Sequence, residues 1–307
     1  MAIFLYSKDH DLDAWVAELR RELPDVRISS DPSDHPDGYR MALVWNAPAT
    51  LFSGMDNLAL VHSTGAGVDH ITRLPLDERI RICRIVDPSM ATQMTQYCLL
   101  HVLRRHRHLE AYADQQEDRV WKRIPTCNAE DYHVGILGLG ALGTHIAQGL
   151  RHLGYTVMGW KRSSSAAPEF PVFTGREGLE TVLRNADHLI ALLPNTPATA
   201  GLLDRAAFSM MKPGSCLIHV GRPQQLDYDA LSAALDAGVL AEAVIDVFDS
   251  EPLDSDSPLW TQPGLKITPH VAAFPRVDRT MRIVSENYRR LISGAPLLHE
   301  IDRTEGY

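Results

Sequence analysis

The sequence is poor in the features that mark secreted and membrane proteins. Its 307 residues include four cysteines with no C-x-x-C pair, which indicates neither a disulfide framework nor a zinc knuckle. No apolar run is long enough to span a bilayer, and the first residues, MAIFLYSKDHDLD, lack a basic leader and cleavage site. We therefore expect a cytoplasmic protein whose thiols are reduced, namely Cys83, Cys98, Cys127 and Cys216.

The chain also lacks an excess of positive charge. Its net charge of -9 argues against a surface that coats nucleic acid or anionic lipid, although a local basic pocket for a small anion is compatible with it. A composition of 45% hydrophobic and 22% charged residues over this length predicts two globular domains with proper cores rather than disorder.

Short apolar segments alternate with amphipathic ones, a pattern typical of a parallel α/β sheet. A first group of expected strands, with a helix near 12–23, covers 2–6, 26–28, 41–45, 58–63 and 81–85. A helical segment from about Ser89 to Trp121 contains no Pro or Gly and is expected to connect the domains. A second group of strands, followed by a last helix near 276–292, covers 133–137, 155–160, 188–193, 215–220, 241–248 and 265–270.

The strongest single motif is VGILGLGALGTHIAQGLRHLG, in which Gly138, Gly140 and Gly143 form G-x-G-x-x-G between an apolar strand and a helix. Glycines permit a tight turn and close backbone approach, and the helix N-terminus offers N–H groups to a pyrophosphate. A glycine-rich turn without a ligand is the alternative. Because strand, turn, helix and next strand are all present, the motif predicts a dinucleotide site.

The segment GWKRSSS lies where such sites usually carry an acid that binds the adenine ribose, about 20 residues after the first glycine. Lys161, Arg162 and Ser163 occupy that place instead. A carboxylate would repel the ribose phosphate of NADP, whereas Lys and Arg attract it. The sequence therefore predicts NADP as cofactor, with NADPH preferred over NADH, against the alternative of a solvated loop.

Three groups of complementary chemistry follow three later strands: Arg222, Glu251 and His270. Ligands of parallel α/β sheets bind outside the carboxyl ends of the strands, so all three are expected to face one crevice. Each has a structural explanation by itself: an ion pair, a turn before Pro252, or a structural histidine. Their coincidence at successive strand ends favours a catalytic site.

These motifs, with LLPNTPAT, DVFDSEPL and ITPHVA, resemble the D-isomer-specific 2-hydroxyacid dehydrogenase family over nearly the whole chain. Within it, ALVWNAP, GAGVD, GWKR, SPLW and the terminal GY are most similar to the bacterial glyoxylate/hydroxypyruvate reductase branch. The resemblance implies a Rossmann-type doubly wound parallel sheet inserted into a smaller flavodoxin-like α/β substrate domain. The implied boundaries are 1–98 and 273–307 for the substrate domain and 99–272 for the dinucleotide-binding domain.

The resemblance also implies roles for these residues. His270 would donate a proton to the oxygen of a small 2-oxo acid while its carbon receives hydride, and Glu251 would orient the imidazole and favour its charged form. Arg222 would bind the carboxylate and polarise the carbonyl. The further substrate contacts implied are Trp45, Ala66 and Gly67. The cofactor contacts implied, besides the three glycines and Lys161 to Ser163, are Ala141, Leu142, Trp160, Leu193, Pro194, Val220, Gly221 and Asp246.

Two positions depart from the family pattern. Pro223 stands where Gly usually follows the catalytic arginine, which removes an N–H and favours extended geometry at Arg222. His219 replaces a more usual Asn, without a functional explanation from the sequence. His101, His106 and His108 lie among arginines that would repel a metal ion, so we expect a solvated or dimer-facing helix surface and no metal site.

Two functions from different classes stay open. The first is an NADPH-dependent reductase of glyoxylate, hydroxypyruvate or another 2-oxo acid, expected to be a homodimer that binds neither nucleic acid nor membrane. The second is a non-catalytic dinucleotide-sensing module, because the fold also resembles that of corepressors. The presence of Arg222, Glu251 and His270 together favours the enzyme.

Overall fold

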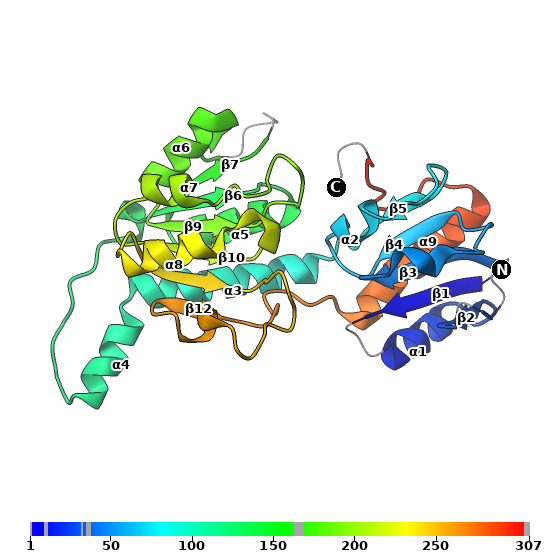
Figure 1. The fold of residues 1–307 in the computed structure, drawn as a ribbon, viewed down its shortest axis with the longest axis horizontal. Helices are drawn as coiled ribbons and strands as arrows, with labels where there is room; N and C mark the ends of the chain where they lie inside the picture. Colours follow the sequence, from blue (N-terminus) through cyan, green and yellow to red (C-terminus); the bar gives the residue numbers. More distant parts are fainter. Residues whose placement is uncertain (1, 9–11, 32, 35–37, 163–168, 304–307) are drawn as a thin grey trace. The chain divides into compact units, whose positions relative to one another are not determined.

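The chain folds into two compact units, Met1–Met90 with Phe274–Tyr307, and Ala91–Ala273 (Figure 1). This computed structural model describes residues 2–8, 12–31, 33–34, 38–162 and 169–303. Of the predicted site residues, Ser163 lies outside these ranges. No helix in the described ranges has both the length and the apolar character needed to cross a bilayer.

The first unit is built on a five-stranded parallel sheet in the order β2-β1-β3-β4-β5. This is the flavodoxin-like order, as predicted. Its strands are β1 Ala2–Ser7, β2 Arg27–Ser29, β3 Tyr39–Trp45, β4 Leu60–Ser63 and β5 Arg81–Cys83. The helical elements of this unit are α1 Asp13–Glu22, the 3-10 turn η2 Ala49–Phe52, α2 Asp69–Thr72 and α9 Val277–Ser293.

The second unit is built on a seven-stranded parallel sheet in the order β12-β11-β10-β9-β6-β7-β8. Counted from β6, this is the doubly wound order 3-2-1-4-5-6 with one strand added, and its topological switch point lies between β6 and β9. The predicted Rossmann-type sheet is confirmed. Its strands are β6 His133–Leu137, β7 Thr156–Trp160, β8 Val172–Phe173, β9 His188–Ala191, β10 Ser215–His219, β11 Leu240–Ile245 and β12 Leu265–Ile267.

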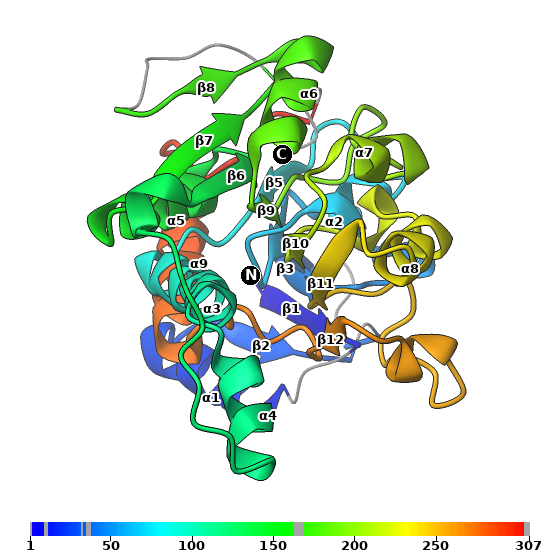
Figure 2. The ribbon, with the colours of Figure 1, turned by 90° about the vertical axis from the view of Figure 1, so that its left-hand side faces the viewer.

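Helices cover both faces of this second sheet (Figure 2). On one face α3 and α5 contribute Cys98, Val102 and Ile146 to a core with the strands, and on the other α6, α7 and α8 contribute Leu183, Phe208 and others. Strands buried from both sides must be apolar along their length, which explains HLIA in β9 and CLI in β10. The helical elements are α3 Pro88–His106, α4 Leu109–Glu117, η3 Ala129–Asp131, α5 Ala141–His152, α6 Gly175–Asn185, α7 Arg205–Met210, η4 Pro223–Gln225, α8 Tyr228–Asp236 and η5 Pro258–Thr261.

The predicted continuous helix from Ser89 to Trp121 is wrong. The helix α3 ends at His106, His108 takes a left-handed backbone conformation with φ of 57°, and α4 ends at Glu117. A left-handed residue cannot continue a right-handed helix. A residue 20 positions further along the chain stabilises the break, because the Thr126 hydroxyl donates to the His106 carbonyl at 2.9 Å. The sequence around the break does not indicate it, since Thr126 is distant in sequence and no Pro or Gly lies at the position.

Candidate active site

The glycine turn joins the carboxyl end of β6 to the N-terminus of α5. Gly138 has φ of 105°, and a Cβ on Gly143 would lie 1.9 Å from the Gly138 carbonyl oxygen. Gly140 is the N-cap of α5 and offers no side-chain cap, and a Cβ there would meet open space. Uncapped N–H groups at a helix N-terminus facing open space fit a pyrophosphate. Ala141 and Leu142 begin this helix and are exposed and half-buried, respectively.

The predicted ribose-binding segment begins at the carboxyl end of β7, directly beside this turn. The Gly138 N–H donates to the Trp160 carbonyl at 2.9 Å, which ties the two loops together. The Trp160 indole N–H donates to the Gly175 carbonyl at 2.8 Å, and the Lys161 N–H donates to the Phe173 carbonyl at 3.1 Å. Three hydrogen bonds therefore fix the backbone that leads into Arg162. The Arg162 side chain is exposed.

Arg222 follows β10 with an extended backbone, φ of -134° and ψ of 138°, as the proline after it predicts. Its side chain is half-buried, and Nη1 donates to the Gly221 carbonyl at 2.9 Å. Gly221 lies against the loop after β9, because a Cβ there would come within 3.2 Å of the Leu193 nitrogen. The predicted cofactor residues Leu193, Pro194, Val220 and Gly221 therefore gather at the carboxyl ends of β9 and β10.

His270 and Glu251 form a hydrogen-bonded pair after the two neighbouring strands. His270 Nδ1 lies 2.8 Å from Glu251 Oε2, with 40% and 39% of the side chains exposed. A carboxylate only accepts, so Nδ1 carries the hydrogen of this bond and Nε2 lies on the opposite side of the ring. Burial raises the pKa of Glu251, but the hydrogen bonds from His270 and the Phe248 N–H, with the charges of His270 and Arg222, outweigh it and hold this pKa below its ordinary value.

The loop that carries His270 is anchored to Asp246, which is 1% exposed. The Asp246 carboxylate accepts from the Thr268 hydroxyl at 2.5 Å and from the Val271 and Ala272 N–H groups at 2.8 and 2.9 Å. The His270 N–H donates to the Asp246 carbonyl at 2.9 Å. Burial raises the pKa of Asp246 against these hydrogen bonds. The predicted cofactor residue thus has a structural task that the sequence did not indicate.

The predicted substrate loop lies in the first unit, after β4. The Ser63 hydroxyl donates to the Gly67 carbonyl at 2.7 Å and accepts from the Gly65 N–H at 3.1 Å, which holds the turn closed. Within the described ranges, the N–H groups of Ala66 and Gly67 donate to no other group, and both residues are half-buried. Such a pair of N–H groups is suited to an anion. Trp45 packs beside this turn, since a Cβ on Gly65 would lie 2.8 Å from its ring.

A sequence model of the D-isomer specific 2-hydroxyacid dehydrogenase NAD-binding domain matches residues 99–272. This match covers more than half of the chain. The chain belongs to the D-isomer specific 2-hydroxyacid dehydrogenase family.

Solved structures of 2-hydroxyacid dehydrogenases resemble the whole chain. One from Xanthobacter autotrophicus Py2, in complex with NADPH and MES, is 33% identical with a TM-score of 0.91, and the match covers 100% of this chain and 99% of that one. An NADPH-dependent glyoxylate/hydroxypyruvate reductase from Sinorhizobium meliloti, in complex with NADP and sulfate, is 32% identical with the same TM-score and coverage. A probable 2-hydroxyacid dehydrogenase from Rhizobium etli CFN 42, with NADP, HEPES and L(+)-tartaric acid, is 30% identical with a TM-score of 0.90, covering 100% and 99% of the chains.

As a member of this family, the protein is an NAD(P)-dependent 2-hydroxyacid dehydrogenase. Its second unit brings Gly138, Leu193, Arg222, Asp246 and His270 to the carboxyl edge of one sheet, whereas Trp45, Ala66 and Gly67 lie in the first unit. The sequence assigned no role to several residues that position these groups: Ser63, Tyr97, His219, Gln225 and Thr268. Their signal lies in long-range contacts, such as the 2.6 Å between the Tyr97 and Thr268 hydroxyls.

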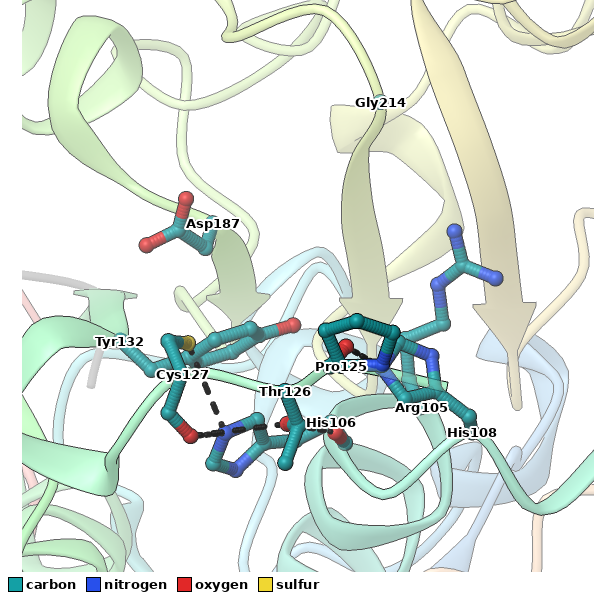
Figure 3. A pocket seen from close by; sticks show the side chains of 9 residues that line it. All are labelled: Arg105, His106, His108, Pro125, Thr126, Cys127, Tyr132, Asp187 and Gly214. Carbon is teal, nitrogen blue, oxygen red and sulfur yellow. Dashed lines mark hydrogen bonds between the residues drawn. The ribbon is translucent and has the colours of Figure 1, made fainter. Parts of the chain in front are cut away.

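A separate cavity of about 310 Å³ lies at the opposite edge of this sheet (Figure 3). Asp187 and Gly214, which line it, precede the amino ends of β9 and β10. Both ring nitrogens of His106 are engaged there, Nδ1 with the Tyr155 hydroxyl at 2.8 Å and Nε2 with the Cys127 carbonyl at 3.0 Å. His106, the last residue of α3, is therefore a structural residue.

Proposed function

We propose that this enzyme reduces small 2-oxo acids such as glyoxylate and hydroxypyruvate to 2-hydroxy acids, with NADPH as the preferred cofactor. The observation that carries the proposal is the His270–Glu251 pair, which lies after strands β12 and β11, with Arg222 after the adjoining β10. An acid, the carboxylate that orients it, and a fixed cation thus follow three adjacent strands. This is the set of groups that reduction of a 2-oxo acid requires.

NADPH supplies the hydride that the substrate carbonyl carbon accepts. His270 Nε2–H donates a proton to the carbonyl oxygen as negative charge develops there, since imidazole exchanges protons near neutral pH. Glu251 keeps Nδ1 as the hydrogen-bonded donor and so directs Nε2 to the substrate. The lowered pKa of Glu251 keeps its carboxylate charged, which stabilises the imidazolium.

Arg222 binds the substrate carboxylate and polarises the carbonyl, because a guanidinium is a permanently charged, forked donor. The Ala66 and Gly67 N–H groups of the substrate loop, in the first unit, are further proposed contacts for an anionic substrate group. This role is supported by the finding that neither N–H group has an acceptor within the described ranges. The preference for short substrates such as glyoxylate and hydroxypyruvate is supported by the similar reductase from Sinorhizobium meliloti, which carries those substrates in its name.

The preference for NADPH depends on Lys161 and Arg162. Both cations follow β7 at the point where a ribose-binding acid would stand, and two backbone hydrogen bonds and one from the Trp160 indole fix the segment that leads to them. Similar structures from three bacteria contain NADPH or NADP. The proposed cofactor contacts are those named from the sequence, with Ser163 outside the described residues.

We also infer a cytoplasmic homodimer whose dimer contacts include the segment of α4 and residues 118–128. Figure 1 shows this segment extending from the sheet of its own unit. Trp121 is 100% exposed, and Leu109 and Val120 are 54% and 48% exposed. Large apolar side chains gathered on one exposed segment are typical of an interface. The cytoplasmic location is supported by four cysteines that are all free thiols.

The experiment that tests this function is a panel of 2-oxo acids assayed with NADPH and with NADH, following the near-ultraviolet absorbance of the reduced cofactor. We expect the highest kcat/KM with NADPH and a short substrate such as glyoxylate or hydroxypyruvate. Higher kcat/KM for a long or branched 2-oxo acid would contradict the proposed substrate class. NADH used as well as NADPH would contradict the proposed cofactor preference.

A further inference from the structure

Two polar side chains beside Arg222 are fully buried and have no part in the mechanism above. His219 is the last residue of β10, and Gln225 ends the 3-10 turn η4, and both are 0% exposed. Polar groups are costly to bury unless they make hydrogen bonds, so the partners of a fully buried His and Gln report what these residues hold in place.

His219 holds the carbonyl of Arg222. Its Nε2 lies 3.0 Å from that oxygen, and because a carbonyl only accepts, Nε2 carries the hydrogen. Burial lowers the pKa of His219 to about 4, so the ring is neutral at physiological pH. A neutral ring directs the Arg222 backbone without adding a second positive charge beside the guanidinium.

Gln225 holds the other side of the same residue. Its Oε1 accepts from the Arg222 N–H at 3.4 Å, and its Nε2 donates to the carbonyls of Leu193 and Pro194 at 2.7 and 3.0 Å. The amide fits because Gly221 has no side chain: a Cβ there would lie 2.7 Å from Oε1. Gln225 therefore links the Arg222 turn to the loop after β9, which carries two of the proposed cofactor residues.

Pro223 makes these contacts more important. It begins η4 and has no N–H, so the backbone between Arg222 and Gln225 has one donor fewer with which to hold the turn. The proline favours an extended Arg222, and contacts of the Arg222 carbonyl and N–H hold it there: the carbonyl meets His219 Nε2 and accepts from the Gln225 N–H at 3.2 Å, and the N–H donates to Gln225 Oε1. The two departures from the family pattern, His219 and Pro223, thus belong to one local arrangement.

We propose that His219 and Gln225 are positioning residues, which rests on the proposed role of Arg222 as the carboxylate-binding group. His219 sets the direction in which Arg222 is presented to the 2-oxo acid. Gln225 also sets the direction of Arg222, and it links Arg222 to the Leu193–Pro194 loop, which carries proposed cofactor contacts. Substrate affinity alone depends on His219, whereas substrate and cofactor affinity both depend on Gln225.

The first test compares His219→Leu, which removes the donor, with His219→Gln, whose amide N–H can replace Nε2–H. We expect His219→Leu to raise KM for glyoxylate about 10-fold, the effect of losing one buried hydrogen bond, with the Kd of NADPH unchanged. His219→Gln restores KM to near the wild-type value. The matched control is His188→Leu, because His188 is equally buried but begins β9 and bonds the Tyr132 hydroxyl at 2.7 Å.

A purely structural role for His219 predicts that both leucine variants lower the melting temperature and leave KM unchanged. An unchanged KM in His219→Leu, or the same rise in His188→Leu, overturns the proposal for His219. Failure of His219→Gln to restore KM overturns the assignment to its N–H.

The second test is Gln225→Met, which keeps the length of the side chain and removes both amide contacts. If His219→Leu does not fold, Gln225→Met still tests whether a buried side chain positions Arg222. We expect KM for glyoxylate and Kd for NADPH to rise together, each about 10-fold. A change in neither constant, or in one alone, overturns the coupling role. Arg222→Ala tests the proposed function separately from the positioning roles. Wild-type turnover in that variant would contradict the role of Arg222 as the carboxylate-binding group, whichever result the other variants give.

Discussion

His270 Nδ1 lies 2.8 Å from Glu251 Oε2, and the His270 backbone has a positive φ of 55°. A left-handed conformation in a residue with a side chain costs on the order of 1 to 3 kcal/mol and persists where surrounding contacts enforce it. Here the His270 N–H donates to the carbonyls of Asp246 and Thr268, at 2.9 and 3.1 Å. The strained backbone and the carboxylate together fix the direction of the imidazole, as a proton donor requires.

Replacement of His270 by Gln is expected to lower kcat by about 10² to 10⁴, the usual contribution of general acid catalysis. NADPH affinity should stay at the wild-type value, because His270 acts on the substrate oxygen. Steady-state kinetics with glyoxylate, combined with a fluorescence titration of NADPH, measure the two effects separately. His152→Gln, at the exposed end of α5, is the control and should retain wild-type kcat. Near-normal kcat in His270→Gln would exclude it as the acid.

The double variant Lys161→Asp/Arg162→Gln is expected to lose its preference for NADPH. Hydrogen bonds to charged groups contribute about 1.5 to 3 kcal/mol each, so the change should exceed about 10²-fold, mostly in KM for NADPH. NADH kinetics should change little or improve. High salt should weaken the wild-type preference, because the contacts are electrostatic. Arg184→Gln, at the end of α6, removes a cation elsewhere and should leave the preference intact.

Much of the second sheet could be predicted from local sequence. Strands such as HVGIL at β6 and HLIA at β9 are buried on both faces, so their apolar runs identify them, and the glycine turn has a fixed spacing. The two-residue β8 is too short to show a period, and it was missed. The break at His108 and the contact of His219 with Arg222 depend on residues brought together by the fold, which sequence periodicity does not encode.

Replacement of Trp121 by Ser is expected to weaken the proposed homodimer, because this fully exposed indole would lose the apolar area it buries against a second chain. Light scattering over a range of micromolar concentrations gives the mass of each species. Leu153→Ser is the matched control, since Leu153 is 47% exposed at the end of α5 and lies outside the proposed interface segment, residues 109–128. A wild-type protein that stays monomeric throughout would rule out the dimer.

Three fully buried histidines are expected to make folding sensitive to mild acid. Burial lowers the pKa of His62 and His219 to about 4 and of His188 to about 3, from an ordinary 6.5. Below pH 6.5 the unfolded chain binds protons that the folded chain does not, so stability present above that pH is lost as the pH falls toward 4. Each group contributes about 1.4 kcal/mol per pH unit within this window.

Urea unfolding at a series of pH values from neutral to about 5 measures this loss. His188→Leu should reduce the slope, whereas His152→Gln, which changes an exposed histidine, should not. A free energy of unfolding that stays constant over this range would show that the buried histidines do not resist protonation.

The measurement that tests the central claim most directly follows the hydrogen itself. The enzyme is given glyoxylate and NADPH deuterated at its transferable position, and the glycolate formed is analysed by mass spectrometry. We expect one deuterium on the carbon that bore the carbonyl, formed in amounts equal to the NADPH consumed, and far slower formation by His270→Gln. Protein that binds NADPH but yields no deuterated 2-hydroxy acid from glyoxylate, hydroxypyruvate or any other 2-oxo acid would contradict the account.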